Sequence, residues 1–172
     1  IVLAGFGRVG HRIGEIFSVA EIPFVALDSN ASIVEQERKN GHPVFYGDVC
    51  NPTLLKAAGA SEAKVVIVTL NDAEDTERLT STLRKIYPDT HIYARGHSLS
   101  KCRELKELGA SGTVSETLET SMELARMVLV KIGYDNNQRE DILDDFRKTY
   151  YAQIDDAALS PDKDANRGDH SL

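Results

Sequence analysis

The 172-residue sequence has few cysteines, no long apolar run and no excess of positive charge. Each of these features argues against one class of protein or binding site. Its two cysteines, Cys50 and Cys102, form no C-x-x-C pair, so they offer no framework for a metal site and suit a reducing cytosol. No apolar run approaches the ~18 residues that a membrane span needs. The net charge of −7 argues against a nucleic-acid-binding protein, because phosphate contacts need clustered lysine and arginine.

The acidic excess lies at the C-terminal end of the chain. Residues 135–172 hold 10 acids and 5 bases, whereas residues 1–134 hold 17 and 15. Residues 156–172 have almost nothing to bury and are predicted to form a disordered acidic tail. At the other end, Ile1 already belongs to a predicted buried strand. We therefore expect the chain to be a piece cut from a longer protein.

Strand-like and helix-like segments alternate along the first 116 residues. Short apolar, β-branched runs predict strands at 1–5, 23–28, 43–48, 64–70, 91–95 and 112–115. Amphipathic stretches predict helices at 8–20, 30–39, 52–58, 72–87 and 98–108. The pattern predicts an α/β fold, a Rossmann-like, doubly wound parallel six-stranded sheet. In helix 8–20, we expect the inward side chains to be Val9, Ile13, Ile16, Phe17 and Ala20.

A helical extension follows the sheet, in residues 117–155 after a domain of residues 1–116. The helix predicted at 116–132 is apolar on more than one side, with a main stripe of Leu118, Met122, Ala125, Leu129 and Ile132. Such a helix is either enclosed within its own domain or part of a subunit interface.

A last amphipathic helix favours the subunit interface. Asn137 and Glu140 resemble a capping box at its start. Apolar side chains then recur every four residues, at Ile142, Phe146, Tyr150 and Ile154. Because this stripe extends beyond a completed sheet, the extension is predicted to form a homodimer.

The most informative motif is the glycine loop between the first strand and first helix. Gly5 permits a tight turn, Gly7 permits close approach of a phosphate, and Gly10 permits contact between helix and strand. The helix N-terminus also favours an anion. Asp28 ends the second strand, where a carboxylate accepts hydrogen bonds from ribose hydroxyls and repels a 2′-phosphate. The motif therefore predicts binding of NAD, AMP or ATP rather than NADP.

Further residues around this loop are candidate nucleotide contacts. Asp48 and the Val49 N–H follow the third strand, where adenine would arrive, and Arg8 follows the second glycine. The alternatives are a turn cap for each acid and a solvated surface arginine for Arg8. The candidate set is completed by Val9, Ser29 and Thr69.

Catalytic groups are not evident beside this loop. The histidines at 11, 42, 91, 97 and 170 form no spaced set, and no Ser-His-Asp or Cys-His arrangement stands out. We therefore predict no catalytic residue and no metal site. A small NAD-dependent oxidoreductase is kept as an alternative function.

Several segments resemble the cytosolic TrkA-N domain, also called the RCK domain, of potassium transport proteins. They are GFGRVG, VALDSN, FYGDVCNPTLLKAAGA, KVVIVTLNDAED, IYARGHS and LKELGASGTVSETLETSMELARMVLVKIG. The likeness covers residues 1–134. Arg8, the FYGD segment and the run from Glu116 to Arg126 resemble in particular the C-terminal domain of Kef-type, glutathione-gated potassium efflux antiporters.

The resemblance implies a function, ligands and partners. It implies a homodimeric regulatory domain, not an enzyme, that follows a membrane antiporter domain at the cytoplasmic face of the bacterial inner membrane. AMP or NAD(H) would occupy the glycine loop, and glutathione or its conjugates would bind at the dimer interface through Arg8, Arg126 and Tyr150. A flavodoxin-like ancillary oxidoreductase accompanies some members. The alternative within the family is a nucleotide-only regulatory domain of another potassium channel or uptake system.

Overall fold

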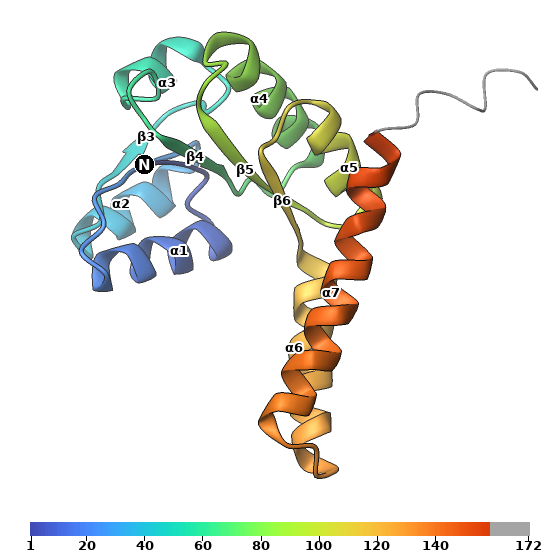
Figure 1. Ribbon diagram of the computed structural model, residues 1–172. Coiled ribbons are helices and arrows are strands. Elements are labelled where there is room, and N and C mark those ends of the chain that lie inside the picture. Colours follow the sequence, from blue (N-terminus) through green and yellow to red (C-terminus); the bar gives the residue numbers. More distant parts are fainter. Residues whose placement is uncertain (159–172) are drawn as a thin grey trace, which may run out of the picture. The chain divides into compact units, whose positions relative to one another are not determined.

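A computed structural model describes the backbone of residues 1–158 and the side chains of residues 1–154. Most of the predicted tail, 156–172, lies outside the described residues; 156–158 continue the last helix. The chain separates into two compact units, one spanning Ile1–Glu116 and one starting at Thr117 (Figure 1). Among the described helices, none has the length and apolar character needed to cross a membrane.

The first unit is built on a six-stranded parallel sheet, as the sequence predicts. Its spatial order is β3-β2-β1-β4-β5-β6, so the strand order reverses between β1 and β4. In sheets of this kind, ligands bind beyond the carboxyl ends of the strands at the reversal point. The strands are β1 (Val2–Ala4), β2 (Val25–Asp28), β3 (Val44–Tyr46), β4 (Val65–Val68), β5 (His91–Gly96) and β6 (Gly112–Ser115).

Helices cover both faces of the sheet (Figure 1). Side chains alternate across β1: Leu3 packs in a core with Phe6 and Val34, whereas Val2 packs in a second core with Leu79. The Leu3 side is covered by α1 (Arg8–Val19) and α2 (Ala31–Lys39). The Val2 side is covered by α3 (Pro52–Ala57), α4 (Ala73–Ile86) and α5 (Leu99–Glu107).

Helix α1 packs through only part of the face expected, with Val9 half-buried. Ile13 and Phe17 do reach the core, but Ile16 is 64% exposed and Ala20 is also exposed. The buried positions are taken by glycines: a Cβ added at Gly14 would lie 2.6 Å from the Phe6 ring. The backbone of α1 therefore approaches the ring closely, and this contact turns Ile16 away from the core.

The second unit pairs α6 (Glu116–Lys131) with α7 (Asn136–Ala158). Leu118 and Met122 of α6 are buried with Leu143 of α7, and Leu129, Tyr150 and Tyr151 pack around them. The predicted stripe therefore packs within this unit at Leu118, Met122 and Leu129, whereas Ile132 is exposed. In α7 the contact with α6 runs through Leu143, and Ile142 and Phe146 of the predicted stripe are exposed in the single chain.

The start of α7 lies two residues earlier than the predicted capping box. The Asp135 carboxylate accepts a hydrogen bond from the Gln138 N–H (2.9 Å), and the Gln138 side chain accepts one from the Asp135 N–H (3.2 Å). This reciprocal pair is a capping box. Glu140, predicted to complete the cap, instead forms an ion pair with Arg126 of α6, which draws its carboxylate away from the helix start.

Candidate nucleotide-binding site

Two glycines shape the loop at the reversal point of the sheet. Gly5 has a φ of +98°, in the left-handed region, and its N–H donates to the Leu27 carbonyl (2.8 Å). A Cβ at Gly10 would lie 2.2 Å from the Gly5 carbonyl oxygen. Both positions therefore require glycine for the backbone itself, whatever the loop binds.

Gly7 differs because the protein leaves space around it. The nearest atom to an added Cβ would be Asn71 Nδ2, at 3.8 Å. Gly7 is also the N-cap of α1 and provides no side-chain cap, and the first turn carries no acid. The backbone N–H groups of that turn and the positive end of the helix dipole are thus available to an anion.

Asp28 holds the loop as well as facing the site. Its carboxylate is nearly buried and accepts hydrogen bonds from the Phe6 N–H (2.6 Å) and the Asn30 N–H (2.7 Å). The first bond ties the glycine loop to the end of β2, which sequence reasoning did not anticipate. The adjacent Ser29 is exposed, and Asn30 caps α2 by accepting from two N–H groups of its first turn. Asp28 keeps lone pairs for a ribose hydroxyl on either oxygen.

Three other candidates differ in how exposed they are. Asp48 is exposed and caps its own turn, accepting a hydrogen bond from the Cys50 N–H (2.9 Å). The Val49 side chain is buried in the core. Thr69 is also buried, and its hydroxyl donates to the Gly5 carbonyl (2.8 Å), so its side chain supports the loop from the β4 end.

Arg8 is the free cation of this loop. It is exposed and makes no hydrogen bond or ion pair within the part of the chain that the structure describes. Beside it, and beside the half-buried Val9, an open groove of about 1000 Å³ extends toward Arg95, with Glu37 in its wall. The arrangement leaves the guanidinium able to meet an anion from the groove or from the loop.

Arg95 is held by protein partners through its two terminal nitrogens, which the sequence did not show. Its guanidinium donates to the Leu70 carbonyl (2.9 Å) and to Asn71 Oδ1 (3.1 Å), and it pairs with Glu116 (3.3 Å). His97 contacts the same Glu116 carboxylate at 3.1 Å. These residues fix the carboxyl ends of β4 and β5 to each other.

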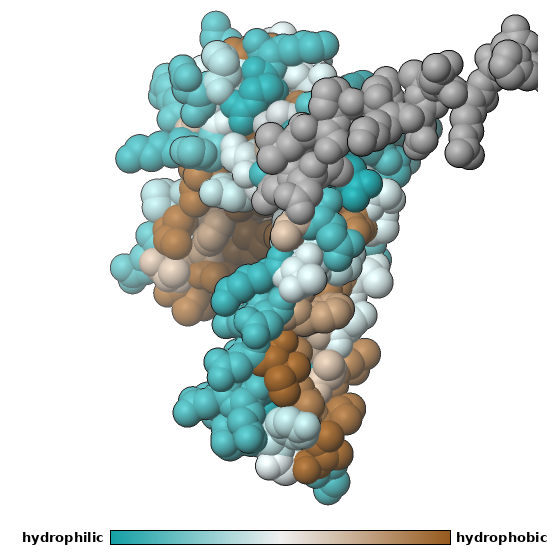
Figure 2. All heavy atoms as spheres, turned by 45° about the vertical axis from the view of Figure 1, so that its right-hand side comes forward, coloured by the Kyte–Doolittle hydropathy of each residue, from teal (hydrophilic) through white to brown (hydrophobic). Residues whose placement is uncertain are grey.

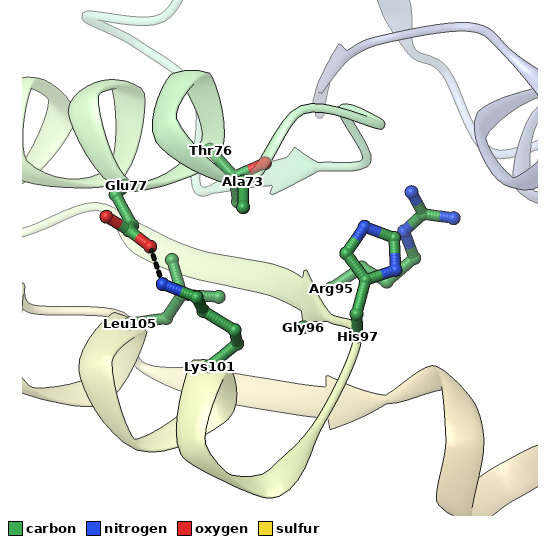
Figure 3. Close-up of a pocket in the computed structure, with 8 residues that line it drawn as sticks. All are labelled: Ala73, Thr76, Glu77, Arg95, Gly96, His97, Lys101 and Leu105. Atoms are coloured by element: carbon green, nitrogen blue, oxygen red, sulfur yellow. Dashed lines mark hydrogen bonds and ion pairs between the residues drawn. The ribbon is translucent and has the colours of Figure 1, made fainter.

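A small gap beside these residues has no room for a substrate (Figure 3). Its volume is about 10 Å³, space for about one water molecule. Lys101 points across it to Glu77 (2.8 Å) and also binds Glu104 (2.6 Å). The hydrogen bonds that Lys101 donates to Glu104 and Glu77 raise its pKa above the ordinary value, which makes it a poor proton acceptor.

The two thiols are equally unsuited to nucleophilic chemistry. Burial raises the pKa of Cys102, which is inaccessible to solvent, and burial also raises the pKa of the half-buried Cys50. A nucleophilic cysteine needs the opposite shift, since the thiolate is the reactive form. Neither side chain is therefore arranged as a catalyst.

The second unit holds the remaining two candidates, and both have partners there. Arg126 pairs with Glu123 (3.2 Å), the alternative that the sequence offered, and also with Glu140. Tyr150 is half-buried, with its ring 5.7 Å from that of Tyr151. A ligand carboxylate at Arg126 would have to compete with two acids.

Comparison with known proteins places the fold among potassium-transport domains. Residues 1–116 match the sequence model of the TrkA-N domain. The chain is similar to the TrkA-N domain of the inner membrane protein ybaL from Escherichia coli, with 26% identity over 73% of this chain and 93% of that one (TM-score 0.68). It is also similar to the AMP-bound Kef C-terminal domain from Shewanella denitrificans, with 25% identity over 92% and 97% of the two chains (TM-score 0.79).

A third similar structure is GsuK bound to ADP, with 28% identity (TM-score 0.67). The match covers 76% of this chain but only 34% of GsuK.

Proposed function

The chain belongs to the TrkA-N family, the regulatory RCK domains of potassium transport systems, and we propose that it is the sensing domain of a glutathione-regulated potassium/proton efflux antiporter. The observation that carries the proposal is the open face at Gly7, bordered by Asp28 and by the unpartnered Arg8. The likeness of almost the whole chain to an AMP-bound Kef domain supports it. An antiporter domain would precede this one at the cytoplasmic face of a bacterial inner membrane, with a flavodoxin-like oxidoreductase as a possible ancillary partner.

In this proposal the glycine loop binds AMP or NAD(H). The phosphate meets the first turn of α1, and the ribose hydroxyls donate to Asp28. The carboxylate of Asp28 disfavours a 2′-phosphate at the same place by charge repulsion. The AMP, ADP and NAD named for the similar Kef and GsuK structures are ligands of this chemical class.

The alternative to the sensing role is that the chain is a small NAD-dependent oxidoreductase. A dehydrogenase needs a proton donor beside the nicotinamide, and neither the lysine nor the thiols described above are suited to proton transfer. We expect the protein to bind NADH but not to oxidise it when incubated with a panel of small aldehydes and ketones. Steady turnover, followed as loss of NADH absorbance, would overturn the sensing role.

The helical unit is proposed to form the homodimer. Figure 2 shows apolar side chains gathered along one side of the α6–α7 pair. Between the helices lies an apolar groove of about 530 Å³, lined by Met122, Val128, Ile142 and Phe146 among others. Val128 and Phe146 are 58% and 56% exposed, and a second copy of these helices would remove them from water.

Glutathione is the proposed ligand at that dimer interface, through Arg8, Arg126 and Tyr150. Glutathione carries two carboxylates, and a guanidinium can bind a carboxylate with two parallel hydrogen bonds. Arg126 lies in a very apolar helix, and its charge is held by Glu123 and Glu140. Because these acids compete with the ligand for Arg126, removing one of them should strengthen the binding of glutathione.

Calorimetric titration of glutathione into Arg126 and Glu140 variants tests this contact. Arg126→Ala should abolish binding, Arg126→Lys should weaken it, and Glu140→Gln should strengthen it by removing a competitor. Lys131→Ala, at an exposed basic position of the same helix, is the control and should bind like the parent. Equal affinity in Arg126→Ala and the parent, or no binding to either at millimolar concentration, would favour the nucleotide-only regulatory domain instead.

A further inference from the structure

We propose that His11, Glu37 and His42 bind a divalent transition-metal ion, with Zn²⁺ as the ion whose chemistry they fit. The three residues come from separate segments: α1, α2 and the turn before β3. The sequence predicts no metal site because its histidines form no spaced set. The packing of α1 beside α2 brings these side chains together.

The distances between the three donor atoms are those of a nearly formed site. Glu37 Oε2 lies 3.0 Å from His11 Nδ1 and 3.8 Å from His42 Nε2. All three donor atoms lie within 4.8 Å of one another. In a tetrahedral Zn²⁺ site with bonds of about 2.0–2.1 Å, ligand atoms lie about 3.3–3.4 Å apart. The observed distances bracket that value, so small side-chain movements would complete the site.

A fourth residue is positioned as an outer partner of His11. The second ring nitrogen of His11, Nε2, lies 3.4 Å from Glu15 Oε1. Histidines that bind metal through one nitrogen usually donate the other N–H to a carboxylate, which fixes the ring and its tautomer. Glu15 is itself held by Arg12 at 2.6 Å. The pairing leaves Nδ1 free to face Glu37.

The charge balance at Glu37 also favours a cation. Its side chain is only 9% exposed, and the groups that face its carboxylate include the rings of His11 (3.0 Å) and His42 (3.8 Å). The Phe6 ring lies 5.9 Å from the His11 ring and 5.6 Å from the His42 ring, which makes one side of the cluster apolar. A divalent ion bound between the three side chains would balance the charge of this buried carboxylate.

The donor set selects the chemical class of ion. Imidazole nitrogen with carboxylate oxygen suits Zn²⁺ and its neighbours in the first transition row, rather than Ca²⁺ or Mg²⁺, which prefer oxygen ligands alone. The cluster lines the open groove beside Arg8, so an ion has a path from solvent. Three protein ligands leave one tetrahedral position for water or an anion from that groove.

The test is metal binding by the untagged 172-residue chain, with Zn²⁺ and Co²⁺ as probes. Calorimetry should give one strong Zn²⁺ site per chain, and Co²⁺ should produce the visible absorption of tetrahedral coordination. His42→Ala and Glu37→Gln should each lose the site, whereas Glu15→Gln should weaken it by roughly 10–100-fold. His91→Ala removes an exposed histidine at the start of β5 and should bind Zn²⁺ like the parent.

Thermal unfolding with and without Zn²⁺ guards against variants that fail to fold. Zn²⁺ should raise the melting temperature of the parent and of His91→Ala but not of His42→Ala, because only a ligand of the native state stabilises it. Absence of Zn²⁺ binding to the parent, or binding unchanged by both His42→Ala and Glu37→Gln, would overturn the proposal and leave the cluster as an ion pair between Glu37 and its histidines.

Discussion

At the scale of single residues, Gly10 tests what the glycine loop needs for folding. Gly7 tests what the loop needs for ligand binding. Gly10→Ala places a Cβ against the Gly5 carbonyl oxygen and should destabilise the protein by about 1–3 kcal/mol. Gly7→Ala places a Cβ at an ordinary contact distance of 3.8 Å from Asn71 Nδ2 and should change the free energy of unfolding by less than about 1 kcal/mol. Urea unfolding measures both values.

The Gly7→Ala variant also tests nucleotide binding. If phosphate approaches Gly7, the added methyl group should weaken AMP binding by about tenfold or more, since tenfold corresponds to only 1.4 kcal/mol. A Gly7→Ala protein that is stable and binds AMP like the parent would show that the phosphate lies elsewhere.

Asp28 combines a folding role with a proposed binding role, so the choice of substitution matters. Asp28→Ala strands the Phe6 and Asn30 N–H groups, whereas Asp28→Asn can still accept one of these bonds. We expect Asp28→Asn to weaken AMP binding by about 1–3 kcal/mol, the usual effect of leaving a polar group without its hydrogen bond. Calorimetry and urea unfolding together distinguish this result from general destabilisation. Unchanged AMP affinity in a folded Asp28→Asn protein would refute the ribose contact.

At the scale of elements, the α6–α7 pair should control association. Val128→Glu introduces a charge into the apolar groove and should convert a dimer to a monomer, because a carboxylate is costly to bury. Lys148→Gln makes the same change in net charge at an exposed polar position of α7 and should remain dimeric. Sedimentation velocity gives both masses. A parent protein that is monomeric at high concentration would contradict the dimer and the glutathione site with it.

The elements also show what a single sequence can and cannot predict. The sheet and the glycine loop follow from local patterns, since strand runs, glycine spacing and Asp28 are contiguous signals. The face of α1 was mispredicted at Ile16 because close packing of Gly14 on Phe6 outweighs the apolar periodicity. Pairings across elements, such as Arg126 with Glu140 or His11 with Glu37, depend on helix packing. No spacing in the sequence encodes them.

At the scale of the whole molecule, residues 1–116 place the chain in the TrkA-N family, and we propose that it acts there as a sensing domain. The first unit has an open helix N-terminus at Gly7, and the second exposes apolar side chains such as Val128 and Phe146. This combination is suited to reporting ligand binding through a change in subunit contacts.

The central claim is nucleotide sensing at the glycine loop, and calorimetric titration of the parent chain with AMP, NADH and NADPH tests it most directly. We predict one binding site per chain for AMP or NADH. We expect NADPH to bind more weakly by about tenfold or more, since repulsion between Asp28 and a 2′-phosphate needs to reach only 1.4 kcal/mol for that difference. Failure of all three nucleotides to bind, or equal affinity for NADPH and NADH, would contradict the claim.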